Sequence, residues 1–272
     1  MTTNLACPVF RKSIACAALS DPGRVRKSNQ DRWLADRQQG FFAVADGLGG
    51  HLAGEVAAQR VVELLPARLQ AALGESDDLA DPATIARMTA AVAQLSRQIR
   101  QEGERWPRTT GMGATLVLAI VRNDKALIVH LGDSRAYLLR GRQLLRLTKD
   151  HSAAQSWIDR GMLTPVEAAR HPAGSGLMRF VGMSRRPQPE ARLVDLQPGD
   201  RLLLCSDGLS RMMSDERIGC ILLHEPEPQN AVGRLIARAN AVGGCDNITA
   251  VLMDVPASAP AAAWPSVAVR CG

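Results

Sequence analysis

The spacing of apolar and polar residues divides the chain into short strands and a few longer helices. Short apolar runs bounded by turn residues predict strands, and the first two cover residues 13–19 and 40–46. Apolar residues at intervals of three and four predict two long helices, over residues 51–73 and 82–104. Pro66 lies inside the first of these helices and should kink or split it.

The second half of the chain is richer in strands. Residues 113–148 contain three or four strands joined by short turns, and residues 192–209 return to strands after a polar excursion over residues 151–182 with weak helical pieces. Two helices, over 215–223 and 229–242, precede a last strand, "DNITAVLMDV". Because strands and helices do not alternate regularly, the order predicts an α+β fold, with antiparallel sheets whose helices pack on the outer faces.

The pattern predicts one domain. No linker and no internal repeat interrupts residues 10–255, so the domain should cover residues 13–255 after an N-terminal extension over residues 1–12. The tail over residues 256–272 is rich in Ala, Pro and Ser, a composition that favours disorder.

Composition argues against membrane and secreted classes. Apolar residues make up 46% of the 272 positions, but no run approaches the roughly 18 apolar residues of a membrane span. Arg11 and Lys12 fall where a signal peptide would need its apolar core. The six cysteines form no Cys-x-x-Cys pair, which suits reduced thiols, and Cys205 and Cys220 are expected as small buried residues. We therefore expect a cytoplasmic protein with no membrane contact.

The charge of the chain does not by itself indicate nucleic-acid binding. The net charge is +6, but the 33 basic residues are scattered among acidic ones, and only nine residues are aromatic. No basic stripe with interleaved aromatic residues is present, so we expect no nucleic-acid partner. An anionic substrate would explain the excess of positive charge equally well. The scattered arginines define no interface, and we expect a monomer.

Aspartates stand repeatedly at the ends of the apolar strands. Asp31, Asp46, Asp133, Asp207 and Asp246 all lie at strand boundaries, two of them in Asp-Gly pairs that follow a strand. A single such residue is usually a turn former. If the strand ends meet at one edge of the sheets, five carboxylates share a pocket and repel one another, and a divalent cation relieves that repulsion. Ligands that are all oxygen favour Mg²⁺ or Mn²⁺ over zinc.

The segment after Asp46 has few side chains that would crowd such an ion. At Gly47 the backbone carbonyl can reach a metal because no side chain intervenes. Neither glycine-rich phosphate-loop spacing is present. His51 and Glu55 are four residues apart and could ligate a metal, but such a pair is more often a contact on a helix face, and no third nitrogen or sulfur ligand accompanies them.

A carboxylate-held metal pair has a characteristic use in phosphoryl chemistry. Two ions about 4 Å apart clamp a phosphoryl group and lower the pKa of a bridging water, so that hydroxide attacks phosphorus directly. A cation must still bind the free phosphate oxygens. Arg24, Arg26 and Lys27 lie just upstream of Asp31, and an arginine is favoured because its planar fork fits phosphate.

Six motifs in order resemble one family. "GRVRKSNQD", "VADGLGGHLAGEVA", "GATLVLAIV", "HLGDSRAYLLR", "SDGLSRMMSD" and "DNITAVLMDV" are similar to the metal-dependent protein phosphatases of the PP2C type, in their compact bacterial form. The resemblance extends over roughly residues 13–255. It implies two antiparallel sheets between helix layers, and hydrolysis of phosphoserine and phosphothreonine in proteins at a pair of Mn²⁺ or Mg²⁺ ions.

The resemblance also implies roles for individual residues. Asp46 should bridge the two metals, the Gly47 carbonyl should ligate one, and Asp207 and Asp246 should complete the other. Asp133 matches a position that helps to hold a third, weaker metal in bacterial members. By the same matching, Arg26 is the phosphate-binding arginine and Asp31 an acidic residue beyond the direct ligands.

This chain departs from the family pattern at three places. Gln30 stands where many relatives have glutamate, which should weaken metal binding. Leu48 replaces the histidine of an Asp-Gly-His motif, so His51 is the alternative as general acid, and an ordinary helix-start role for it is about as plausible. Residues 171–182 match only loosely the block after the excursion; the excursion itself, 151–182, matches a mobile flap beside the active site.

The resemblance implies phosphorylated proteins as substrates and a cognate Ser/Thr kinase as the opposing enzyme. Two other functions remain as alternatives: a two-metal phosphodiesterase or nuclease, suggested by the basic charge, and a non-catalytic module that kept only the fold. The first would need a nucleic-acid track, which the scattered aromatic residues do not provide. The second would be favoured by loss of Asp46, Asp207 or Asp246, and all three are present.

Overall fold

The computed structural model describes residues 14–48, 51–74 and 76–256, apart from the side chains of residues 51, 52 and 169. The predicted N-terminal extension and nearly all of the predicted tail lie outside these residues.

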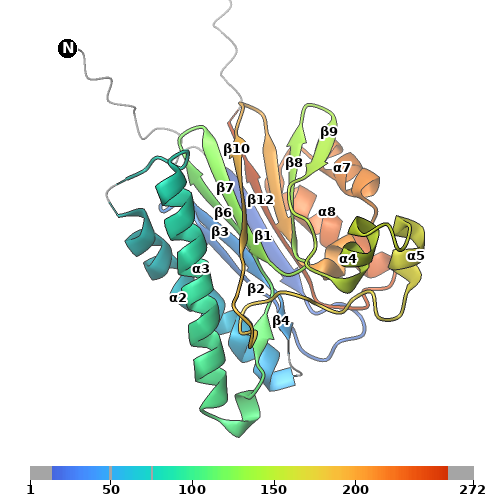
Figure 1. The fold of residues 1–272 in the computed structure, drawn as a ribbon. Coiled ribbons are helices and arrows are strands. Elements are labelled where there is room, and N and C mark those ends of the chain that lie inside the picture. The colour runs from blue at the N-terminus through green and yellow to red at the C-terminus, as the bar shows by residue number, and fades with distance from the viewer. Residues whose placement is uncertain (1–13, 49–50, 75, 257–272) are drawn as a thin grey trace, which may run out of the picture.

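Two five-stranded antiparallel sheets lie face to face (Figure 1). The first has the order β1 (Ala15–Asp21), β12 (Ile248–Asp254), β11 (Arg201–Cys205), β8 (Arg135–Arg140) and β9 (Gln143–Arg146). The second has the order β10 (Glu190–Asp195), β7 (Lys125–Leu131), β6 (Leu116–Arg122), β3 (Phe41–Ala45) and β2 (Arg32–Asp36). A short ladder joins β4 (Gly47–Leu48) to β5 (Gly113–Ala114).

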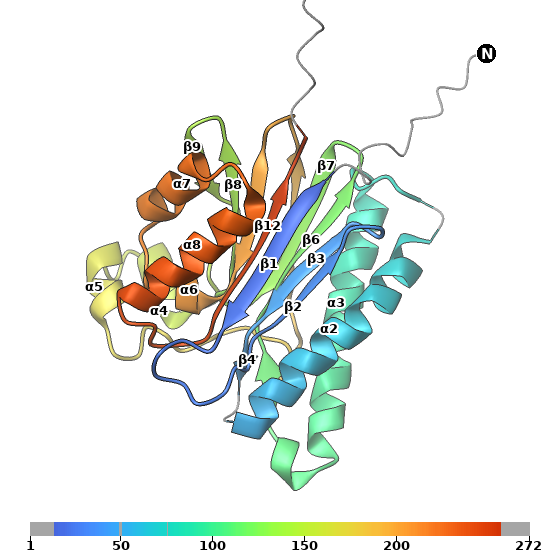
Figure 2. The ribbon, with the colours of Figure 1, turned by 180° about the vertical axis from the view of Figure 1, so that it is seen from behind.

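Helices cover the outer face of each sheet (Figures 1 and 2). The second sheet is covered by α2 (His51–Leu73) and α3 (Pro82–Glu104), and the first by α7 (Asp215–His224) and α8 (Pro228–Ala241). The shorter elements are η1 (Pro107–Thr109), α4 (Ala153–Asp159), α5 (Pro165–Arg170) and α6 (Asp207–Ser210). The predicted α+β fold of antiparallel sheets between helix layers is confirmed.

Three apolar layers lie between the two helix layers and the two sheets. Along β3, Phe41 packs with α2 and α3, whereas Phe42 and Val44 pack between the two sheets. The third apolar layer joins the first sheet to α7 and α8. Because successive side chains of a strand point to opposite faces, a strand covered on both sides must be apolar throughout, which explains the unbroken run "FFAVA".

Some elements differ from the predictions. Pro66 does not split the helix over residues 51–73, because Leu65 and Leu69 beside it are buried in the core and hold the helix together. Strand β2 was not predicted, since an edge strand of five residues carries too weak a pattern. Cys205 is buried as expected, but Cys220 is exposed on the outer face of α7, so that prediction was wrong.

Other boundaries agree closely with the pattern. The helix predicted over 82–104 has those bounds. It begins there because the Asp81 carboxylate accepts a hydrogen bond from the Ala83 amide and Pro82 occupies its first turn. Among the described residues, no helix is both long and apolar enough to span a membrane.

Candidate metal centre

The five strand-end aspartates come together at one end of the sandwich. Four of them, Asp46, Asp133, Asp207 and Asp246, line a cleft with a volume of about 290 Å³. The fifth, Asp31, is 2% exposed, and its negative charge lies close enough to repel those of Asp46, Asp207 and Asp246. The prediction that carboxylates from distant strands share one pocket therefore agrees with the geometry.

Asp46 is at the centre of this charge. Burial, together with the negative charges of Asp31, Asp207, Asp133 and Asp246, raises the pKa of its carboxyl group well above the usual range. Its backbone is fixed from both sides: the amide donates to the Thr115 hydroxyl at 3.1 Å, and the carbonyl accepts from the Thr115 amide at 2.8 Å.

Asp31 is held rigidly behind the cleft. Its Oδ2 accepts hydrogen bonds from the hydroxyls of Ser206 and Thr249, each at 2.7 Å, and so ties the start of β2 to α6 and β12. Burial raises the pKa of Asp31 to about 6, against the opposing effect of the two hydroxyls. Its Oδ1 is buried and has no hydrogen-bond partner among the described residues.

The donor set fits a pair of hard divalent cations. Oδ1 of Asp207 is also buried without a partner in the described part of the chain, so two buried carboxylate oxygens of this cluster lack a donor. Unpaired buried carboxylates are costly, and a cation removes that cost. With only oxygen donors gathered here, Mg²⁺ and Mn²⁺ fit better than a metal that prefers nitrogen or sulfur.

Two glycines allow the close approach of the chain segments that carry these oxygens. A Cβ on Gly47 would lie 2.2 Å from the Gly54 carbonyl oxygen, and a Cβ on Gly208 would lie 1.9 Å from that of Asn247. No other residue fits at either position without moving the backbone. The glycine next to Asp46 therefore lets α2 pack against β4, and the glycine next to Asp207 lets α6 pack against the 246–247 segment.

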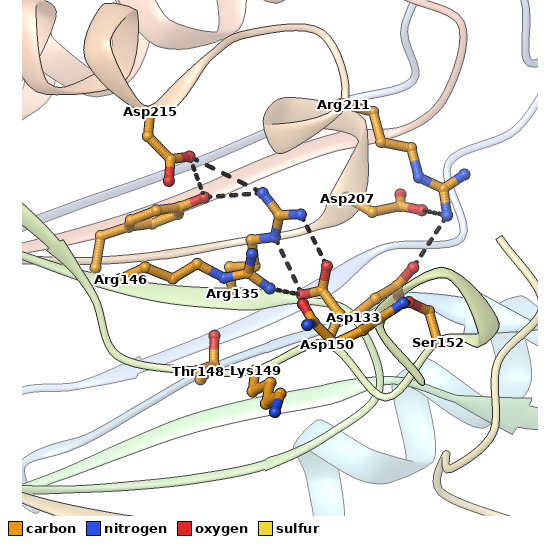
Figure 3. Close-up of polar contacts among 12 residues, drawn as sticks. Asp133, Arg135, Arg146, Thr148, Lys149, Asp150, Ser152, Asp207, Arg211 and Asp215 are labelled. Atoms are coloured by element: carbon orange, nitrogen blue, oxygen red, sulfur yellow. Dashed lines mark hydrogen bonds and ion pairs between the residues drawn. The ribbon is translucent and has the colours of Figure 1, made fainter. Parts of the chain in front are cut away.

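Two arginines bring positive charge to the carboxylates. Arg26 places Nη2 2.8 Å from Oδ2 of Asp246, and its side chain is 54% exposed. Arg211 places Nη2 2.7 Å from Oδ2 of Asp207 and 3.0 Å from Oδ2 of Asp133 (Figure 3). Arg26 was predicted; Arg211 was not.

Sequence reasoning also missed Asn247. Its side-chain oxygen accepts from the Gln30 amide at 2.8 Å, and its amide nitrogen donates to the carbonyls of Pro22 and Ser28. Asn247 thereby holds the loop that carries Arg26. The signal for Asn247 was its place beside Asp246, and the signal for Arg211 was its spacing of four residues from Asp207, one helical turn.

Part of the excursion over 151–182 borders the cleft, since Ser175 and Leu177 line it, and its role as a mobile flap stays a prediction. Short bridges join Ser152 to Leu177 and Ala114 to Val181. The His51 backbone begins α2, but its side chain lies outside what the structure describes, so its role as an acid stays a prediction.

A second cluster of metal-ligand types, His130, His151 and Glu190, lies apart from the cleft. The Gly132 amide donates to Nδ1 of His151, so the neutral ring carries its proton on Nε2, which faces Glu190 at 3.3 Å. Arg179 lies 2.6 Å from the same Glu190 oxygen. The Glu190 carboxylate thus already faces the Arg179 guanidinium and the Nε2 proton of His151. With these partners in place, the cluster does not fit a metal ion.

Comparisons with known proteins agree with this geometry. A family model described as Protein phosphatase 2C matches residues 24–227. The Ser/Thr protein phosphatase PstP of Mycobacterium tuberculosis is 41% identical over 241 residues, which cover 88% of this chain and 44% of PstP. This chain therefore spans less than half the length of that relative. The Ser/Thr phosphatase stp of Listeria welshimeri is 34% identical over 86% of this chain and 93% of its own length.

A solved structure extends the comparison to three dimensions. The catalytic domain of a PstP phosphatase in complex with two manganese ions superposes with a TM-score of 0.76 at 38% identity, over 89% of this chain and 98% of that one. The family model, the relatives and the shared fold lead to one conclusion: this chain belongs to the protein phosphatase 2C family.

Proposed function

We propose that the chain is a Mn²⁺- or Mg²⁺-dependent phosphatase that removes phosphate from phosphoserine and phosphothreonine in proteins and opposes a bacterial Ser/Thr kinase. The observation that carries the proposal is the convergence of Asp46, Asp207 and Asp246 on one cleft beside Arg26. These three carboxylates, together with the Gly47 carbonyl, would hold two metal ions. When bound, the two metal ions would supply hydroxide from a metal-bound water at neutral pH.

Arg26 is the group we assign to the substrate phosphate. Its guanidinium lines the cleft, and one of its nitrogens is held by Asp246. The guanidinium has five donors in a planar fork, so those not used by Asp246 can bind phosphate oxygens while Asp246 fixes the orientation. His51 is proposed as the group that protonates the leaving serine or threonine oxygen.

Asp31 supports the site from behind the cleft. Held by Ser206 and Thr249, it keeps a negative charge close to Asp46 and Asp207, which strengthens the attraction of the cluster for divalent cations. A nuclease function is less well supported, because the cleft offers two arginines and no aromatic side chain among its lining residues.

The decisive experiment is phosphate release from a phosphothreonine peptide by the purified protein, with Mn²⁺, with Mg²⁺ and with EDTA. We expect metal-dependent release that EDTA stops and that Asp207→Asn abolishes without loss of fold by circular dichroism. Asp195→Asn, on an exposed carboxylate, is the matched control and should keep full activity. No release with either metal from the folded protein would favour the non-catalytic alternative, and full activity of Asp207→Asn would contradict the metal assignment.

A further inference from the structure

Two buried carboxylates of the cleft share one guanidinium. Asp133 and Asp207 come from different parts of the sandwich, after β7 and at the start of α6, and their side chains are 8% and 11% exposed. Nη2 of Arg211 lies 3.0 Å from Oδ2 of the first and 2.7 Å from Oδ2 of the second (Figure 3). One nitrogen therefore bridges the two carboxylates.

The local chain geometry places Arg211 there. Arg211 directly follows α6, and its amide donates to the Asp207 carbonyl at 2.8 Å, which continues the helical turn. Residues four apart on such a turn lie on the same face, so the Arg211 side chain is set beside the Asp207 carboxylate by the backbone itself. A cation held by the chain in this way cannot diffuse out of the cleft.

The two oxygens of Asp207 consequently have different surroundings. Oδ2 forms an ion pair with Arg211 at 2.7 Å, whereas Oδ1 is buried and has no hydrogen-bond partner among the described residues. Only Oδ1 is therefore free for a metal. The carboxylate of Asp133 differs, because the positive charge that faces it is the guanidinium.

We propose that Arg211 takes the place of a divalent cation between Asp133 and Asp207, so that this chain holds two metal ions and Asp133 is not a metal ligand. The inference rests on the proposed metal-dependent function and deepens it. A Mg²⁺ ion must lie about 2.1 Å from each oxygen that it binds. An ion between these two Oδ2 atoms would therefore compete with Nη2 for the same space and would be repelled by its charge.

The balance of charge supports the same conclusion. Five carboxylates carry five negative charges, and two divalent ions with Arg26 and Arg211 carry six positive ones, before a phosphate dianion enters. A third divalent ion would leave a clear excess of positive charge in a cleft of this size. Arg211 therefore neutralises the Asp133 carboxylate at any concentration of free metal.

The test counts Mn²⁺ bound to the metal-free protein, from the signal of free Mn²⁺ in electron paramagnetic resonance during titration. The wild type and Arg211→Lys, which keeps the charge, should each bind two ions per chain. Arg211→Ala should bind one additional, weaker ion, and Arg211→Ala combined with Asp133→Asn should return to two. Arg217→Ala, which removes an exposed charge from α7, is the matched control and should bind two.

Each other outcome overturns the proposal. Three ions in the wild type, or two in a folded Arg211→Ala, would show that Arg211 does not replace a metal. Asp133→Asn alone provides a second check that does not depend on the folding of Arg211→Ala: it should leave the count at two, and a lower count would make Asp133 a ligand. A wild type that binds no Mn²⁺ would overturn both proposals, whereas two bound ions without phosphate release would contradict only the proposed activity.

Discussion

The buried ion pair between Arg135 and Asp150 allows a quantitative prediction of stability. Asp150 lies at the entry to the excursion over 151–182, and its carboxylate accepts from Nε and Nη2 of Arg135 at 3.1 and 2.8 Å and from Arg146 (Figure 3). The side chains of Arg135 and Asp150 are 19% and 12% exposed. Asp150→Ala removes the acceptor and leaves a largely buried guanidinium without its main partner.

The expected loss follows from that burial. Breaking a buried ion pair from one side costs about 3–5 kcal/mol. Arg135 retains the Tyr137 hydroxyl at 3.2 Å and the Asp215 carboxylate at 3.9 Å, so we expect a value near the lower end, about 3 kcal/mol. For a domain of this size that corresponds to a fall in Tm of roughly 6–12 °C.

Urea unfolding followed by circular dichroism measures the difference. Asp159→Ala is the matched control, because Asp159 pairs with Lys149 at 2.8 Å but both side chains are well exposed, and it should cost less than about 0.5 kcal/mol. Arg135→Met combined with Asp150→Leu should recover part of the loss, since the Arg135 charge is no longer left unpaired, whereas Arg146 still loses its contact with Asp150. A cost of Asp150→Ala equal to that of Asp159→Ala would refute the argument.

Three further outcomes concern the metal centre. Gly47→Ala should weaken Mn²⁺ binding at least tenfold while the protein still folds, because its Cβ would collide with the Gly54 carbonyl; isothermal titration calorimetry with Mn²⁺ measures it, and unchanged affinity would contradict the close packing. The pKa of Asp31, raised to about 6 by burial, means that the folded metal-free protein binds this proton more tightly than the unfolded chain. The contribution of Asp31 to the unfolding free energy in EDTA should therefore rise by about 1.4 kcal/mol as the pH falls from 7.5 to 5, and Asp31→Asn should remove this contribution. Identical pH profiles of the wild type and Asp31→Asn would refute the assignment. His51→Ala should slow hydrolysis of a phosphopeptide far more than that of p-nitrophenyl phosphate, whose leaving group needs no proton; equal slowing would exclude His51 as the acid.

The sequence predicted the parts of the fold and site that local pattern determines. The bounds of α3 follow from apolar residues at helical spacing with Pro82 at the start, and the position of Asp46 follows from an apolar strand that ends in Asp-Gly. Both signals lie within a few residues. The family resemblance then supplied the roles of the aspartates, which spacing alone left open between turn formers and metal ligands.

What the sequence did not reveal depends on contacts between distant segments. The edge strand β2 owes its conformation to pairing with β3 and has little periodicity of its own. The role of Arg211 depends on Asp133, which lies 78 residues earlier in the chain. Asn247 and Asp31 likewise act across more than 200 residues, on Ser28 and Thr249 respectively. No window of the sequence contains these pairs.

The pairing of β1 with β12 has a consequence for how the chain folds. Ala15 lies opposite Asp254 and Asp21 opposite Ile248, so β1, the first of the described strands, is hydrogen-bonded within its sheet to β12, the last of them (Figure 2). Asp246, just before β12, arrives equally late. Such long-range pairing folds slowly, on a scale of milliseconds to seconds, because the ends must find each other across the whole chain. A nascent chain on the ribosome therefore cannot bring Asp246 to the cleft until β12 has emerged, so this set of carboxylates is completed only after both sheets have been synthesised.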